Sequence, residues 1–322
     1  MLYFALRRLA STVGVLVTIS VVTFLIFFAT PGVDPAARIA GRNADPATLA
    51  QVRHTFGLDR PLPVRYLLMM DHLLIKHDLT SYVNRGAAVI PQVIQAAPVT
   101  LSLVIGAAVI WMVLGVLLGT VSAATRGTVA DPVMMMIGVV GVSVPTYWLG
   151  EVVNLLTQDK WHSGAFSWVP PLGYVSLTAN PVQWALHLLF PWLTLAVLYA
   201  GIYARVLRGE ILEALNEDYV RTARAKGLSE RRVLIAHALR CSLIPIVSLF
   251  GLDFGALIGG AALLNEVVFG LPGIGLLTYN ALQDLDLPVI MACVLYAAFF
   301  VVLANAVVDI VYAAIDPRVR RA

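Results

Sequence analysis

A polar, basic segment interrupts the apolar second half of the chain and carries its most distinctive chemistry. Residues 218–232 read DYVRTARAKGLSERR between two long apolar runs. Asp218 is predicted to cap a two-turn helix that ends at Gly227, because glycine adopts the left-handed conformation without steric cost. Ser229 is predicted to cap the next helix, with Glu230 in its first turn. A short exposed helix with small residues suits insertion into the cleft of a partner protein, and a basic helix lying on anionic lipid is the alternative.

A few polar side chains fall inside apolar stretches, where they are costly and indicate function by default. Asp253 lies mid-way along such a stretch between Gly251 and Gly255, so it either faces a cavity or bonds a neighbouring helix. Glu151 and Asn154 lie near the end of another stretch and are expected to be interfacial. No spacing of His, Cys, Asp or Glu predicts a metal site, and we expect none.

The elements that must position these residues are membrane-spanning helices. The chain has 322 residues, of which 59% are hydrophobic and only 13% charged, whereas soluble domains carry about 25% charge. A span needs about 20 apolar residues. Six segments meet this length: roughly 9–30, 99–125, 132–155, 183–204, 241–265 and 289–315. We therefore predict an all-α, polytopic membrane protein with six transmembrane helices, and Pro145 is expected to kink the third.

The distribution of Lys and Arg predicts the orientation. Most of the 22 basic residues fall in segments that share one side if both termini are inside. The predicted topology is N-in and C-in, with residues 31–98, 156–182 and 266–288 outside. In the first of these, Asp-Pro and Pro-Leu-Pro sequences predict short helices between turns. Nothing in the modest net charge of +3 indicates nucleic acid.

Two glycine-containing motifs invite an enzymatic interpretation that their details exclude. Residues 270–275 (GLPGIG) lack the Lys-Ser/Thr pair that a nucleotide-binding loop requires, and the predicted topology places them outside. They are expected to form a tight turn. Residues 141–145 (GVSVP) end in Pro145 rather than the final glycine of a nucleophile elbow. We expect no ATPase site and no catalytic residue in this chain.

Four separated motifs resemble those of one family. Residues 219–227 (YVRTARAKG), followed by HALR and LIP, resemble the cytoplasmic EAA loop of the permeases of dipeptide and oligopeptide ABC importers. Residues 143–150 (SVPTYWLG), 265–275 (NEVVFGLPGIG) and the tail 316–320 (DPRVR) are similar to the same family, in the same order. The resemblance covers nearly the whole chain, and the long first outer segment is similar to that of the first of two paired permeases.

The resemblance implies a type I ABC importer permease fold and a role as half of a peptide channel in the cytoplasmic membrane. It implies a first helix with its outer segment over residues 1–98, a permease core over 99–315 with a coupling loop at 205–240, and a tail over 316–322. The implied partners are a second permease, two cytosolic ATPases that bind ATP and Mg, an external substrate-binding protein and membrane lipid, with no cofactor bound by this chain. The implied ATPase-coupling residues are Asp218, Tyr219, Val220, Arg221, Thr222, Ala223, Arg224, Ala225, Lys226 and Gly227.

Some features depart from the family pattern or leave alternatives. Arg221 stands where the family has an acidic residue, which Glu217 or Asp218 could replace from the preceding turn. We expect Tyr147, Asp253 and Asn305 to line the pathway. Nickel chelates and glutathione are alternative substrates, because permeases for them look alike. An ion-coupled secondary transporter is the alternative from another class, but it predicts inverted repeats that the two halves do not display. A membrane-embedded hydrolase is a third.

Overall fold

The structure, a computed structural model, describes residues 2–29, 35–40, 44–55, 57–84, 86–160 and 164–315. Within these ranges the regular secondary structure is helical, apart from one isolated β-bridge between Thr80 and Ala88. The chain divides into two compact units, one of residues 1–99 and 272–302 and one of residues 100–271 and 303–322. The tail motif at 316–320 lies outside the described residues.

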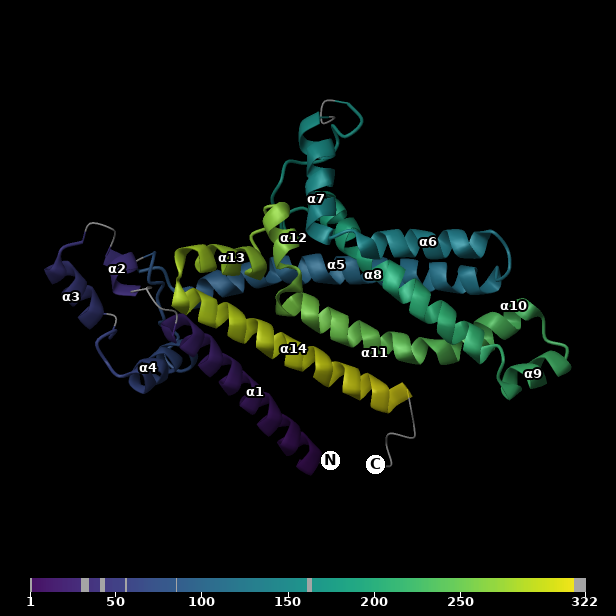
Figure 1. The fold of residues 1–322 in the computed structure, drawn as a ribbon, viewed down its shortest axis with the longest axis horizontal. Helices are drawn as coiled ribbons and strands as arrows, with labels where there is room; N and C mark the ends of the chain where they lie inside the picture. The colour runs from purple at the N-terminus through teal and green to yellow at the C-terminus, as the bar shows by residue number, and fades with distance from the viewer. Residues whose placement is uncertain are drawn as a thin grey trace. The chain divides into compact units, whose positions relative to one another are not determined.

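The apolar helices agree with the predicted spans. Five unbroken segments are long and apolar enough to cross a membrane, and a bent pair of helices raises the number to six within the described residues. The unbroken ones are formed by α1 (Leu2–Ala29), α5 (Val89–Ala124), α8 (Pro181–Ala214), the series α10 (Glu230–Arg232), η2 (Val233–Leu239), α11 (Arg240–Ala256) and η3 (Leu257–Ala261), and α14 (Leu287–Ile315) (Figure 1). The prediction of an all-α membrane protein is confirmed.

The third predicted span is sharply bent. It consists of α6 (Ala130–Ser143) and α7 (Thr146–Asn154), which meet at 90° and are followed by the π-helical turn η1 (Leu155–Lys160). Pro145 precedes α7 and has no N–H to donate, so it interrupts the helical ladder. The expected kink is therefore confirmed, although a single straight helix over 132–155 is excluded.

Glycines bring the helices of the larger unit close together. Gly138 of α6 faces Gly201 of α8, where an added Cβ would lie 2.3 Å from the Gly138 carbonyl oxygen. Gly115 and Gly119 of α5 lie against Tyr203 and Ala204 of α8 in the same way. Small residues at this spacing allow backbones to approach in a membrane, where dispersion and hydrogen bonds drive association. The close approach fixes α5, α6 and α8 as one packed group.

The smaller unit contains the predicted short helices between α1 and α5. They are α2 (Pro35–Ala40), α3 (Pro46–Thr55) and α4 (Leu62–Leu74), and α13 (Ile274–Asp284) belongs to the same unit. Asp45 precedes α3 and accepts the Thr48 amide at 3.2 Å, and hydrogen bonding from the Thr48 side chain and amide holds the pKa of Asp45 below its usual range. The core of the unit packs Phe24 and Met69 against Leu287 and Met291.

Candidate functional site

The basic segment forms the short helix α9 (Asp218–Ala225), which follows α8 after a three-residue connection (Figure 1). The start of α9 differs from the prediction. Glu217 occupies the N-cap position without a side-chain capping bond, and Asp218 is the first helical residue. The Asp218 carboxylate instead accepts a hydrogen bond from Arg221 at 3.3 Å, one turn along the helix. Both side chains are exposed, so this ion pair adds little stability.

The end of α9 follows the prediction. Gly227 has a φ of +80°, in the left-handed region. Its N–H donates to the Arg224 carbonyl at 2.9 Å, and the Leu228 N–H donates to the Ala223 carbonyl at 3.3 Å. These two bonds constitute a Schellman motif, which satisfies carbonyls that the helix end would leave without partners. The chain therefore turns sharply after α9 at a position that favours glycine.

One face of α9 is packed inside its own segment. Val220 is 0% exposed and Ala223 is 6% exposed, and both contact Val233 of η2, with Leu215 and Leu228 at the edge of the cluster. Ala223 is therefore buried rather than exposed as expected, and the part of Val220 and Ala223 in ATPase coupling stays a prediction. The apolar contacts fix the helix against the beginning of the next span.

Arg224 also holds the segment together. Its guanidinium donates to both carboxylate oxygens of Glu230, at 2.8 and 3.1 Å, and to the Leu215 carbonyl at 3.4 Å. The hydrogen bonds to Glu230 raise the pKa of Arg224 above its ordinary value. Ser229 does occupy the N-cap position before Glu230, but its side chain makes no capping bond. Arg224 thus links the two sides of the glycine turn.

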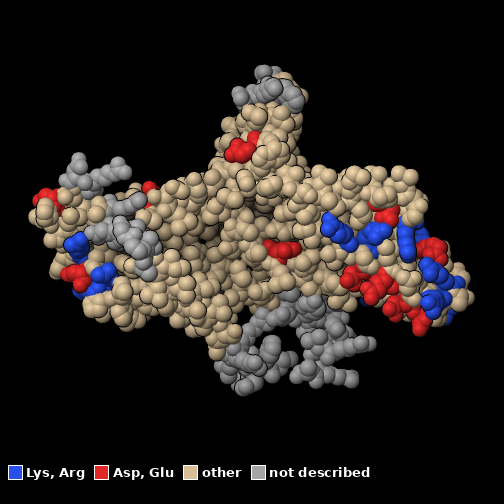
Figure 2. All heavy atoms as spheres, viewed as in Figure 1, with Lys and Arg blue, Asp and Glu red and all other residues tan. Residues whose placement is uncertain are grey.

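The opposite face of α9 is free of these contacts and forms a polar ridge. Charged side chains of both signs gather at the end of the molecule that bears α9 and α10 (Figure 2). The residues on the ridge recur at the spacing of one helical face. We define this α9 ridge as the exposed residues Asp218, Arg221, Thr222 and Ala225, flanked by Tyr219 and Lys226.

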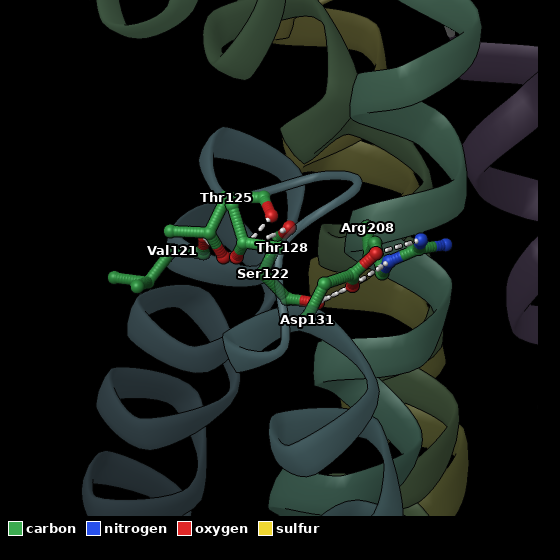
Figure 3. Close-up of polar contacts among 6 residues, drawn as sticks. All are labelled: Val121, Ser122, Thr125, Thr128, Asp131 and Arg208. Atoms are coloured by element: carbon green, nitrogen blue, oxygen red, sulfur yellow. Dashed lines mark hydrogen bonds and ion pairs between the residues drawn. The ribbon is translucent and has the colours of Figure 1, made fainter.

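A partly buried ion pair joins α8 to α6. Arg208 donates from Nε and Nη2 to the two carboxylate oxygens of Asp131, at 2.6 Å each, and Ser122 donates to the same carboxylate (Figure 3). The Asp131 side chain is only 9% exposed. The three residues come from α8, α6 and α5. They join these three helices.

This ion pair did not emerge from the sequence. Asp131 and Arg208 are 77 positions apart, and each stands at the polar edge of an apolar run, where a solvated charge is the ordinary interpretation. The only available signal was that Asp131 precedes a proline at the start of a span. Which basic residue it meets depends on the packing of α6 against α8.

A second buried polar group surrounds α12 (Leu263–Val268). Asn265 donates to the Pro191 carbonyl at 3.1 Å and accepts from Thr194 at 3.2 Å. Glu266 is 0% exposed and accepts from Thr100 at 2.6 Å. Asn154, expected to be interfacial, donates to the Val268 carbonyl at 2.8 Å. These bonds fix α12 against α5, α7 and α8.

The three predicted pathway residues lie on three different helices. Asp253 of α11 accepts a hydrogen bond from the Tyr203 hydroxyl of α8 at 3.0 Å, so it does bond a neighbouring helix, while its side chain stays partly exposed. Tyr147 on α7 is 46% exposed, and Asn305 on α14 is half-buried. Among the described residues no hydrogen bond joins these three side chains. Their place along a pathway stays a prediction.

The described part of the chain contains no group of three or more His, Cys, Asp or Glu residues arranged to hold a metal ion. The turn after α12 has none of the lysine and hydroxyl chemistry of a phosphate loop. Leu271 is buried and donates its N–H to the Glu266 carbonyl at 2.9 Å. The expectation of a tight turn at residues 270–275 agrees with the positive φ of Gly270, +61°.

Comparison with known families accounts for these features together. Residues 112–321 match the family described as "Binding-protein-dependent transport system inner membrane component", and residues 1–105 match its N-terminal companion. The chain belongs to this permease family. It is therefore a multi-pass transport subunit of the cytoplasmic membrane, and the family is one of ABC importers that work with ATPases and substrate-binding proteins.

The curated relatives match over almost their full length. A protein of Brucella abortus (strain 2308) described as a peptide transport system permease is 37% identical over 315 residues, covering 98% of both chains. A peptide ABC transporter permease of Sinorhizobium fredii is 35% identical, over 98% of this chain and 99% of its own. The glutathione transport system permease GsiC of Salmonella choleraesuis is 38% identical over 99% of both. The resemblance seen in the motifs is confirmed.

Proposed function

We propose that this chain forms half of the translocation channel of an ATP-driven peptide importer. Relatives named as peptide permeases, matched from end to end, support the substrate class. In this proposal both termini and the α9 segment are cytoplasmic, the other half of the channel is a second homologous permease, and an external binding protein delivers the peptide. The chain has no ATPase site of its own, and the two partner ATPases bind ATP and Mg.

The α9 ridge carries the proposal for coupling. It is exposed on one side, while the other side is fixed by Val220, Ala223 and the Arg224–Glu230 pair. A helix packed in this way can move as a rigid body with the segment that it contacts, as a two-state rearrangement requires. The ridge would seat in a groove of an ATPase. Tyr219, Arg221, Thr222, Ala225 and Lys226 would then make the contacts, rather than Val220 and Ala223.

The partly buried Arg208–Asp131 pair would carry the movement inward. α9 follows α8 after only three residues, and Arg208 ties α8 to α6 through two short charged bonds. Breaking a buried pair is costly because it leaves a charge without a partner. The ends of α5, α6 and α8 would therefore move together when an ATPase displaces α9.

Thiol cross-linking in the assembled importer tests the coupling proposal. The chain offers a matched pair of positions on one helix, exposed Ala225 and buried Ala223. With a thiol-to-amine cross-linker, Ala225→Cys is expected to trap an ATPase and Ala223→Cys is not. An intact complex in which neither variant, or only Ala223→Cys, cross-links to an ATPase would refute the seating of the ridge.

Glutathione is the second candidate substrate, because the relative named as a glutathione permease is as similar as the peptide permeases. Glutathione is itself a tripeptide, so a similar channel could pass both. Competition for uptake into proteoliposomes that contain the whole importer separates the candidates. Inhibition of labelled dipeptide uptake by other peptides but not by glutathione supports a general peptide importer, and the reverse supports glutathione.

Tyr147, Asp253 and Asn305 are proposed to line the pathway. Asp253 is the sharpest test because its residue is only partly buried and its carboxylate accepts a hydrogen bond from Tyr203. Asp253→Asn keeps the shape and an acceptor while removing the charge. Uptake of cationic peptides is expected to fall relative to neutral ones, with assembly unchanged. Equal loss for all peptides, or a complex that fails to assemble, would assign Asp253 a structural role.

A further inference from the structure

A polar hollow of about 410 Å³ lies in the smaller unit, between the end of α1 and the short helices that follow it. It is far in sequence from the α9 segment and takes no part in the coupling proposed above. Its floor includes apolar side chains such as Leu58 and Met69. The side chains that give it its character are Phe28, His54, Arg60, Arg65, His72 and Asp78.

The two arginines of the hollow are held in different ways. Arg65 donates from Nε to the Arg60 carbonyl at 2.6 Å, and its guanidinium lies 5.2 Å from the centre of the Phe28 ring. These contacts fix its orientation while leaving the Nη groups as donors. The Arg60 side chain is exposed and makes no hydrogen bond or ion pair within the described ranges. Two guanidinium groups therefore share the rim of one hollow.

The single carboxylate of the lining is already engaged. Asp78 bonds His72 Nδ1 at 2.7 Å, and this hydrogen bond holds the pKa of Asp78 below its usual range. Asp71, nearby on α4, pairs with Lys76 at 2.6 Å. Neither carboxylate is bonded to Arg60 or Arg65. The hollow thus offers guanidinium donors to an anion from outside the chain.

The hollow adjoins the end of an apolar span, so we place it at the level of the membrane surface. Phe28 in its lining is also the last residue of the apolar span Ala10–Phe28. α4 buries Met69 and Leu73 on one face, yet Leu67 and Leu74 elsewhere on it are 65% and 60% exposed. A helix with apolar residues both inside and outside the fold is suited to lie in the lipid interface. Headgroup phosphates occupy that level.

We propose that this hollow binds the phosphate of an anionic phospholipid headgroup, held by Arg60 and Arg65. Phosphate matches the planar donor fork of arginine, and a diacyl lipid bound there would place its acyl chains along the exposed apolar residues of α4. The site would anchor the short helices at a fixed depth.

Lipid binding to the purified full importer tests the site. Native mass spectrometry in mild detergent measures the retention of phosphatidylglycerol and phosphatidylcholine, and Arg60→Gln, Arg65→Gln and the double variant are compared with the parent. Each single substitution is expected to lower phosphatidylglycerol affinity about fivefold, which corresponds to about 1 kcal/mol. Lys76→Gln is the matched control, since it removes one charge from the same region outside the lining, and it is expected to change affinity less than twofold.

The outcomes separate the possible ligands. Unchanged phosphatidylglycerol binding in the double variant overturns the proposal, as does equal binding of phosphatidylcholine by the parent. Displacement of the lipid by millimolar soluble glycerol phosphate would show that the site takes free phosphate, which also overturns it. Arg60→Gln keeps the test valid if Arg65→Gln fails to fold, because the Arg60 side chain makes no bond within the described ranges.

Discussion

Two short helices of the larger unit, α9 and α12, end in the same way but lie in opposite surroundings. Each is closed by a glycine of positive φ, Gly227 at +80° and Gly270 at +61°. The residue after each glycine, Leu228 or Leu271, donates its N–H to the carbonyl of the residue five positions earlier. The local chemistry that stops the helix is therefore identical.

The polar side chains of the two helices differ in their exposure to solvent. On α9 the residues Asp218, Arg221 and Thr222 are exposed, while on α12 Asn265 and Glu266 are fully buried and bonded to other helices. An exposed polar side chain can exchange water for a partner at little cost. A buried one must keep its bonds. We therefore predict that α9 is free to contact a partner, whereas α12 is held in place by its buried hydrogen bonds.

The largest expected effect comes from the Arg208–Asp131 pair. Arg208→Ala leaves the Asp131 carboxylate without its main partner and is expected to lower stability more than the variants that follow. The thermal midpoint of the purified complex measures this loss. The charge-swapped variant Asp131→Arg with Arg208→Asp is expected to restore part of it. If Arg208→Ala melts like the parent, α8 and α6 are held by their glycine contacts alone.

The next prediction compares the stability lost when a buried polar side chain of α12 and an exposed one next to α9 are removed. Asn265→Ala removes one bond to the Pro191 carbonyl and one from Thr194, so a loss of about 1–3 kcal/mol is expected. The matched control is Asn216→Ala in the connection to α9, where the exposed amide donates to the Leu212 carbonyl and, within the described ranges, to no other group. Its change is expected within about 0.5 kcal/mol. Equal losses for both variants would contradict the contrast between buried and exposed polar groups.

The two glycines allow a direct comparison at one backbone conformation. A side chain in the left-handed region costs about 1–2 kcal/mol, and no atom lies within 4 Å of a Cβ at Gly227, while the nearest to one at Gly270 is 3.9 Å away. Gly227→Val and Gly270→Val are therefore expected to lose similar stability. Only Gly227→Val is expected to raise the ATP hydrolysed per peptide transported in proteoliposomes. Normal coupling in that variant would show that the turn after α9 is not a mechanical element.

The smallest effect on stability is expected at the ridge itself. Arg221 is 72% exposed at its side chain, so Arg221→Glu should change stability by less than about 0.5 kcal/mol. The proposed ATPase contact should nevertheless weaken, which co-purification of the ATPases through a salt series measures. Arg231→Glu, an identical charge change on α10, is the control. Indistinguishable salt profiles for the two variants would place Arg221 outside the contact.

The sequence predicted the features that depend on neighbouring residues. Runs of apolar residues predicted the spans, and Pro145 predicted the bend between α6 and α7. Gly227 predicted its own left-handed turn, since the residue type limits the backbone there. The start of α9 was less well determined, because Glu217 and Asp218 are both compatible with the cap position and the structure uses Glu217.

The tertiary structure alone decided which polar groups meet and which face of α9 remains free. Arg208 and Asp131 are both at the edge of apolar runs, and nothing in their spacing says that α6 lies against α8. The sequence alone allowed Val220 and Ala223 to face a partner, whereas in the structure they pack in one cluster with Val233. Local propensity acts over a few residues, whereas burial and ion pairing depend on helices far apart in sequence. The chain itself therefore determined the helices, and packing in three dimensions determined the surface that they present.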